Sequence, residues 1–149
     1  MGAIDAELTA DATGDRLFAE SLANVLAINL TRHVHWERSQ VGMLPQSTLR
    51  TVIDYIEGHL EASLTLEQMA AVAHLSPYHF ARQFKKATGL PPHQYVIARR
   101  VERAKILLRQ SSDLSLMQVA VRVGFSDQSQ LTRHFKRIVG VTPGQFRRH

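Results

Sequence analysis

The chain has 149 residues and a net charge of +5; 44% of its residues are apolar, 21% are charged and none is cysteine. This composition suits one or two small folded domains, and the lack of cysteine excludes disulfides, thiolate zinc sites and a cysteine nucleophile. The sequence shows neither a transmembrane stretch nor a secretory signal, so we expect a cytoplasmic protein without membrane contact.

The net charge combines two halves of opposite sign. Residues 1–75 carry four basic and ten acidic side chains, whereas residues 76–149 carry fourteen basic and three acidic ones. The halves therefore have net charges of −6 and +11. A half this basic points to a polyanionic partner, although a solvated basic surface is the alternative.

The N-terminal part is expected to contain a tail, one helix and a linker. Residues 1–14 are small, polar and acidic, which predicts a disordered tail. Residues 15–33 show a helical pattern whose apolar surface is too broad for an ordinary surface helix, so this helix needs something to pack on. Gly42 and Pro45 are typical of a linker, which we extend to residue 46.

After the linker, only helical periodicity is found, and the helix ends carry local signals. Thr65 with Gln68 and Ser115 with Gln118 have the spacing of capping boxes. Gly89 is placed to end a helix. The fold class is therefore all-α, with helices expected at about 46–60, from 65 to a turn at 75–76, and at 77–88, 91–110, 115–123, 127–139 and from 142 onward.

An internal repeat lies within residues 64–146. The pattern of residues 64–76 recurs fifty positions later, and that of residues 82–95 recurs fifty-one positions later. The added residue falls at the start of the second unit's longer helix. Each unit is a capped short helix, a tight turn and a longer basic helix, which indicates two homeodomain-like helix-turn-helix subdomains joined by a long helix.

Helical spacing separates a core face from an outer face in both longer helices. Phe80 and Ala87 share the core side with Phe84, and Leu131 and Ile138 share it with Phe135. The opposite faces are polar and basic, which favours a nucleic-acid surface over a merely solvated one because the arrangement occurs twice. They carry Tyr78, His79, Arg82, Lys85 and Lys86 in the first helix, and Ser129, Gln130, Arg133, Lys136 and Arg137 in the second.

The two longer helices contain the residues expected to contact DNA. Arginine binds guanine through two hydrogen bonds, glutamine pairs with adenine, and serine and threonine accept several bases. The expected base contacts are Tyr78, Arg82, Gln128, Ser129, Thr132 and Arg133. Phosphate contacts, which position a protein without reading sequence, are expected from Lys85, Lys86, Lys136 and Arg137. Arg99, Arg100 and Arg103 either add phosphate contacts or form a solvated face.

The connecting helix has a length that suits DNA. Its nineteen residues span about 28 Å, and successive major grooves on one side of B-DNA lie about 34 Å apart. One chain is therefore expected to place two recognition helices in adjacent major grooves over roughly 15–20 base pairs. Because the two units differ in sequence, the site would be asymmetric.

The segment 120–136, with its continuation through residues 140–147, resembles the signature of the AraC/XylS family of bacterial transcription regulators. Residues 75–85 are similar to the first unit of that family. The resemblance covers 47–148 and implies helix-turn-helix units at 47–90 and 111–148 with a linker helix at 91–110. It further implies promoter binding, contact with RNA polymerase, activation of transcription, and a place in the cytoplasm on the nucleoid.

Many members of this family carry a sensor domain before the DNA-binding domain, and residues 15–33 resemble the helix that ends such a domain. Residues 15–46 would then come from a regulatory or dimerisation region, and residues 15–33 are the candidate homodimer contact. On this interpretation the chain is the C-terminal part of a longer regulator. An effector ligand is expected only if a separate N-terminal sensor domain exists.

Two other classes of function fit the sequence less well. An enzyme is disfavoured because the sequence has no nucleophile motif and no glycine-rich phosphate loop. The histidines at 33 and 35 are poor metal partners because positions two apart on a helix point in different directions, so no catalytic residue, metal or cofactor is expected. The remaining alternative is a helical protein-interaction or dimerisation module in which DNA binding is secondary.

Overall fold

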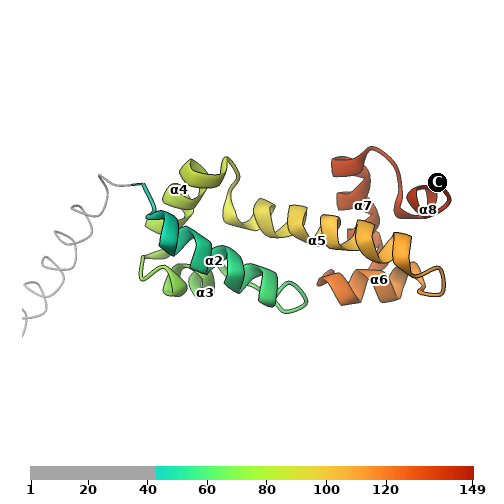
Figure 1. Cartoon of the computed structure of the whole chain (residues 1–149), viewed down its shortest axis with the longest axis horizontal. Helices are drawn as coiled ribbons and strands as arrows, with labels where there is room; N and C mark the ends of the chain where they lie inside the picture. The colour runs from blue at the N-terminus through green and yellow to red at the C-terminus, as the bar shows by residue number, and fades with distance from the viewer. Residues whose placement is uncertain (1–42) are drawn as a thin grey trace, which may run out of the picture. The chain divides into compact units, whose positions relative to one another are not determined.

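A computed structural model describes residues 43–149 of the chain, which form one compact unit. The expectations for residues 1–42, including the helix at 15–33 and its dimer contact, lie outside the described residues. The described part is all-helical, as predicted (Figure 1). In chain order the helices are α2 (Gln46–Gly58), α3 (Leu66–Val72), α4 (Pro77–Thr88), α5 (Pro92–Gln110), α6 (Leu116–Val123), α7 (Gln128–Val139) and α8 (Pro143–Arg147).

The helix ends lie where local chemistry places them. Both expected capping boxes form, so the side chains of Thr65 and Ser115 accept the backbone N–H of the residue three positions on. Gly89 ends α4 with a left-handed φ of 81°, a conformation open to glycine because it has no Cβ. Helix α2 is shorter than expected and ends at Gly58, although Leu60 is still buried.

The described residues have two hydrophobic cores, which meet at Val96 and Ile97 in the first half of α5. The first core lies in the first lobe (residues 43–90), formed by α2, α3 and α4, and it takes Val96 from α5. The second lies in the second lobe (residues 111–148), formed by α6, α7 and α8, and it takes four residues of α5. These four residues are Ile97, Val101, Ala104 and Leu108. Helix α5 thus connects the two lobes while belonging mainly to the second core.

The repeat is visible in the backbone. Helices α4 and α7 both have 12 residues. The turn before each of them closes in the same way, since the N–H of Leu75 donates to Ala70 at 3.0 Å and that of Phe125 donates to Ala120 at 2.9 Å. The added residue lies in the turn just before α7 rather than inside the helix. Asp127 therefore caps α7 at the place where Ser76 caps α4.

One expected core position on α7 is wrong. Ile138 is 43% exposed, whereas Val139 packs against the second core. Both Leu131 and Phe135 are fully buried as expected. Val139 follows Phe135 by four positions, so it lies about 40° from it around the helix, whereas Ile138 lies about 60° away on the other side.

Candidate nucleic-acid interface

Helix α4 presents the first expected contact surface. Tyr78 is 66% exposed and Arg82, Lys85 and Lys86 are exposed, while the opposite side of the helix is anchored by the buried Phe80 and Phe84. The guanidinium of Arg82 lies over the ring of Tyr78, with 5.8 Å between Cζ and the ring centroid. The two expected base-contacting residues of this helix are thus adjacent on its outer face.

The first turn of α4 is held by its own side chains. Ser76 Oγ accepts the backbone N–H of His79 at 3.3 Å and lies 2.6 Å from His79 Nδ1. Pro77 occupies the first helical position, where its missing N–H costs nothing. The first turn of α4, which carries Tyr78, is therefore held in place by its cap.

Helix α7 repeats this arrangement in the second lobe. Gln128, Ser129 and Arg133 are exposed and Thr132 is half-buried. Farther along the helix, the expected phosphate contacts Lys136 and Arg137 are also exposed. All six expected residues of α7 therefore lie outside the second core, on a helix whose start is capped by Asp127 at 2.7 Å from the N–H of Gln130.

His134 lies on α7 but not on its outer face. Its ring stacks on Phe125, with centroids 5.5 Å apart and planes inclined by 14°. Burial lowers the pKa of His134 below its usual value, and the nearby positive charges of Arg137, Arg133 and His93 lower it further. His134 is therefore a packing residue that favours the neutral form.

The cations of α4 and α7 differ from those of α5 in their partners. Neither α4 nor α7 contains an aspartate or glutamate, and their arginines and lysines have no carboxylate partner among residues 43–149. Three ion pairs are found in the described part of the chain, and all of them use α5. Figure 1 shows α4 and α7 on the same side of α5, with α3 and α6 on the other. An uncompensated positive charge of this kind attracts a polyanion.

Three of the four arginines of α5 (Arg99, Arg100 and Arg103) contact the first lobe, which neither interpretation of the sequence anticipated. Arg99 pairs with Glu57, and this hydrogen bond raises the pKa of Arg99. Arg103 pairs with Glu61, with 3.7 Å between Nη2 and Oε1. Arg100 donates from Nε to the carbonyl of Leu60 at 2.9 Å and from Nη2 to that of Ala62 at 2.8 Å. The sequence contains a signal for these pairs. Glu57 and Glu61 are four residues apart, and so are their partners Arg99 and Arg103.

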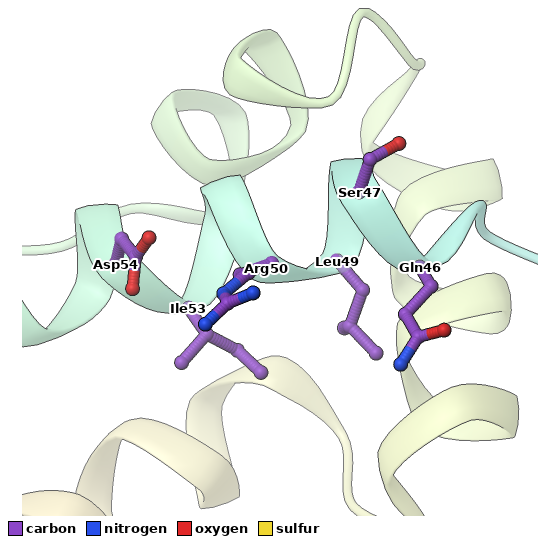
Figure 2. Close-up of a pocket in the computed structure, with 6 residues that line it drawn as sticks. All are labelled: Gln46, Ser47, Leu49, Arg50, Ile53 and Asp54. Carbon is purple, nitrogen blue, oxygen red and sulfur yellow. The ribbon is translucent and has the colours of Figure 1, made fainter.

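The described residues also include a groove beside α2, with a volume of about 710 Å³. Figure 2 shows Gln46, Leu49 and Ile53 pointing to the same side of this helix, away from Ser47. Its remaining lining residues, Arg50 and Asp54, form no ion pair with any residue from 43 to 149. Among residues 43–149 no group of three metal-ligating side chains is found. No helix in this part of the chain has the length and apolar character needed to cross a membrane.

Comparison with known proteins gives consistent matches. A family model described as a helix-turn-helix domain matches residues 69–149. LumQ of Photobacterium leiognathi is 32% identical over 89% of this chain and 52% of its own length. A Streptomyces antibioticus protein classed as an AraC-like transcription regulator is 31% identical over 100% of this chain and 50% of its own length. The chain thus spans about half the length of these two relatives.

A solved structure resembles the described part of the chain. The DNA-binding domain of AdpA, a global transcriptional factor, was crystallised in complex with a target DNA. It matches with a TM-score of 0.63 and 37% sequence identity, covering 66% of this chain and 88% of that one.

Proposed function

Because the chain belongs to the AraC family of helix-turn-helix transcription regulators, we propose that it binds an asymmetric promoter site with α4 and α7 in adjacent major grooves. One observation carries the proposal: two equivalent helices present outer faces whose arginines and lysines have no carboxylate partner among the described residues. The proteins it matches are regulators rather than enzymes, and we assign no catalytic residue and no cofactor.

The base contacts in this proposal come from the first half of each helix. Arg82 and Arg133 are the guanine readers, since a guanidinium can bond O6 and N7 together. Gln128 is suited to adenine, and Ser129 and Thr132 tolerate more than one base. Tyr78 lies beside Arg82 and completes the reading surface of α4.

The phosphate contacts come from the second half of each helix. Lys85 and Lys86 are in the last turn of α4, and Lys136 and Arg137 are in the last turn of α7. Each of these four side chains is exposed. Contacts of this kind fix the register of the protein on the duplex and supply most of the non-specific affinity.

The spacing of the two helices is provided by α5. Its 19 residues give a length of about 28 Å, comparable with the separation of about 34 Å between successive major grooves on one side of the duplex. The two lobes differ in sequence at the base-contacting positions, which supports an asymmetric rather than a palindromic site.

The regulatory part of the proposal follows from the family. We place the protein on promoter DNA in the bacterial cytoplasm, where it contacts RNA polymerase and activates transcription. Dimerisation through residues 15–33, and control by an effector bound to a separate sensor domain, belong to the same proposal. Light scattering at high concentration tests dimerisation, because a strict monomer would remove it.

A salt titration on fragmented genomic DNA separates DNA binding from a helical interaction module. With four phosphate contacts, we expect the logarithm of the binding constant to fall with the logarithm of salt concentration with a slope of about −3 to −4. The chain carrying Lys85→Ala and Lys136→Ala should lose roughly half of this slope. The DNA proposal would be contradicted by weak binding that does not depend on salt.

A further inference from the structure

The two lobes do not share a hydrophobic core. In α5, Val96 is buried in the first core and its neighbour Ile97 in the second. No buried apolar residue among those described belongs to both clusters. The position of α7 relative to α4 therefore depends on the continuity of α5 and on contacts outside the cores.

Arg100 makes the most extensive of these contacts. Its guanidinium donates to the carbonyls of Leu60 and Ala62, which follow α2 in the first lobe. The Cζ atom of this guanidinium lies 5.9 Å from the ring centroid of Phe125, which is in the turn between α6 and α7 of the second lobe. Arg100 is half-buried at this junction, and this burial lowers its pKa.

Gly124 brings the second lobe against the same point. A Cβ on this residue would overlap the carbonyl oxygen of Leu60 and lie 2.6 Å from Arg100 Nε. Its φ of 100° is a second reason for glycine at this position. Gly124 ends α6 and lies four residues before Gln128, the first residue of α7, so the contact is close in the chain to the recognition helix.

The rest of the junction is loosely filled. A cavity of about 480 Å³ is lined by Glu61 and Ser63 of the first lobe and by Val121 and Ser126 of the second. Of the two flanking ion pairs of α5, Arg99–Glu57 is half-exposed and Arg103–Glu61 is exposed, and pairs in contact with solvent contribute little. Arg100 is therefore the residue best placed to resist bending between the lobes.

We propose that the contact of Arg100 and Gly124 with the Leu60 carbonyl is a positioning device that sets the half-site spacing the protein accepts. This inference rests on the proposed two-groove binding. One added base pair moves the second half-site by about 3.4 Å and turns it by about 35° around the duplex axis. A fixed junction cannot follow both changes, whereas a loosened junction can.

The test compares DNA duplexes that carry the preferred half-sites with spacers shortened or lengthened by one or two base pairs. The wild-type chain should lose at least tenfold in affinity for each one-base-pair change. Arg100→Met removes the donors but keeps an unbranched stem, and it should reduce this discrimination to threefold or less. Arg103→Met is the matched control, since it removes the same charge from the next turn of α5, and it should retain the wild-type profile.

A measurement without DNA separates the two proposals. The protein has no cysteine, so Glu67→Cys and Met117→Cys allow spin labels at exposed positions, one in each lobe. The label distance distribution should broaden in Arg100→Met and stay unchanged in Arg103→Met. Unchanged distances in Arg100→Met would overturn the positioning role whatever the DNA results. Broadened distances with no spacer preference in the wild-type chain would instead overturn two-groove binding.

A folding control keeps the result interpretable. Cooperative thermal unfolding of Arg100→Met would show that this variant is folded. Any wider tolerance of spacer length then comes from the junction and not from loss of the fold. If this variant does not fold, Arg100→Lys keeps the charge but lacks the planar donor fork, and it should show intermediate spacer discrimination. Full wild-type discrimination in a folded Arg100→Met or Arg100→Lys chain would overturn the proposal.

Discussion

His74 and Gly124 occupy the same position in the two repeats, fifty residues apart, and both have a left-handed backbone, with φ of 55° and 100°. Each is followed by a residue whose N–H closes the turn on a carbonyl five positions earlier. The first repeat therefore places a side chain in a conformation that the second gives to glycine. A non-glycine residue in this region carries a conformational cost of about 1–2 kcal/mol.

His74→Gly should consequently stabilise the protein by about 0.5–1 kcal/mol, because the relief of strain is partly offset by the greater freedom of glycine in the unfolded chain. Chemical denaturation measures this change. Gly89→Ala and Gly124→Ala are the reference variants. The first places Cβ in open space and should cost about 1–2 kcal/mol, whereas the second meets Leu60 and should cost more. Equal costs would contradict the close approach at Gly124.

The two faces of α7 predict different effects on stability. Phe135 is fully buried and packs edge-on against Phe146, with ring centroids 5.3 Å apart. Phe135→Ala should lower the free energy of unfolding by roughly 3–5 kcal/mol. Ile138→Ala, at a 43% exposed position of the same helix, should change it by less than about 0.5 kcal/mol. Similar losses from both variants would show that α7 is rotated relative to the arrangement described.

The base-contacting and phosphate-contacting residues of α7 are predicted to have different effects on DNA binding. Arg133→Ala should cost about 1–3 kcal/mol on the specific site and relax the preference at one base pair. An equal loss on random DNA would refute its role as a reader. Competition assays on single-base variants of the site measure both quantities.

Lys136 is one turn of helix nearer the C-terminus of α7 than Thr132, and it is expected to hold a phosphate. Lys136→Ala should weaken binding to all sequences alike and reduce the salt slope by about 1. The same competition and salt series on this variant supply the comparison with Arg133→Ala. A changed base preference after Lys136→Ala would move this residue to the reading surface.

His134 predicts a pH dependence of stability. Because its pKa is lowered in the folded protein, the unfolded chain binds a proton more readily than the folded one below the usual histidine pKa of about 6.5. Stability should therefore be lost as the pH falls below this value, and it should be fully present above it. His134→Gln removes this contribution while the other histidines remain. Parallel stability curves for the two proteins between pH 5 and 8 would contradict the stacked, neutral His134.

Much of the fold can be predicted from the sequence because its signals are local. The capping boxes at Thr65 and Ser115 and the glycine at Gly89 each act within four residues, and these helices begin or end where expected. The Ile138 error has a physical origin: spacing alone does not fix which of two flanking positions faces the core. The repeat aligned His74 with Gly124, but only the backbone angle shows the shared conformation.

The junction was not predictable in the same way. Arg100 bonds carbonyls 38 and 40 residues earlier in the chain, and backbone acceptors leave no trace in side-chain patterns. The outer faces of α4 and α7 were predictable because burial of Phe84 and Phe135 fixes which side chains remain outside. Most of the side chains predicted on these faces are exposed, whereas His79, Gln130 and Thr132 are half-buried. The contacts of these faces with DNA remain proposals.

Selection of bound duplexes from a random pool by the full chain tests two-groove binding most directly. Two-groove binding predicts an asymmetric motif with two conserved blocks about ten base pairs apart, centre to centre. Arg133→Ala should degrade one block and Arg82→Ala the other. A single block, or two blocks that both weaken with the same variant, would contradict the placement of α4 and α7 in separate grooves.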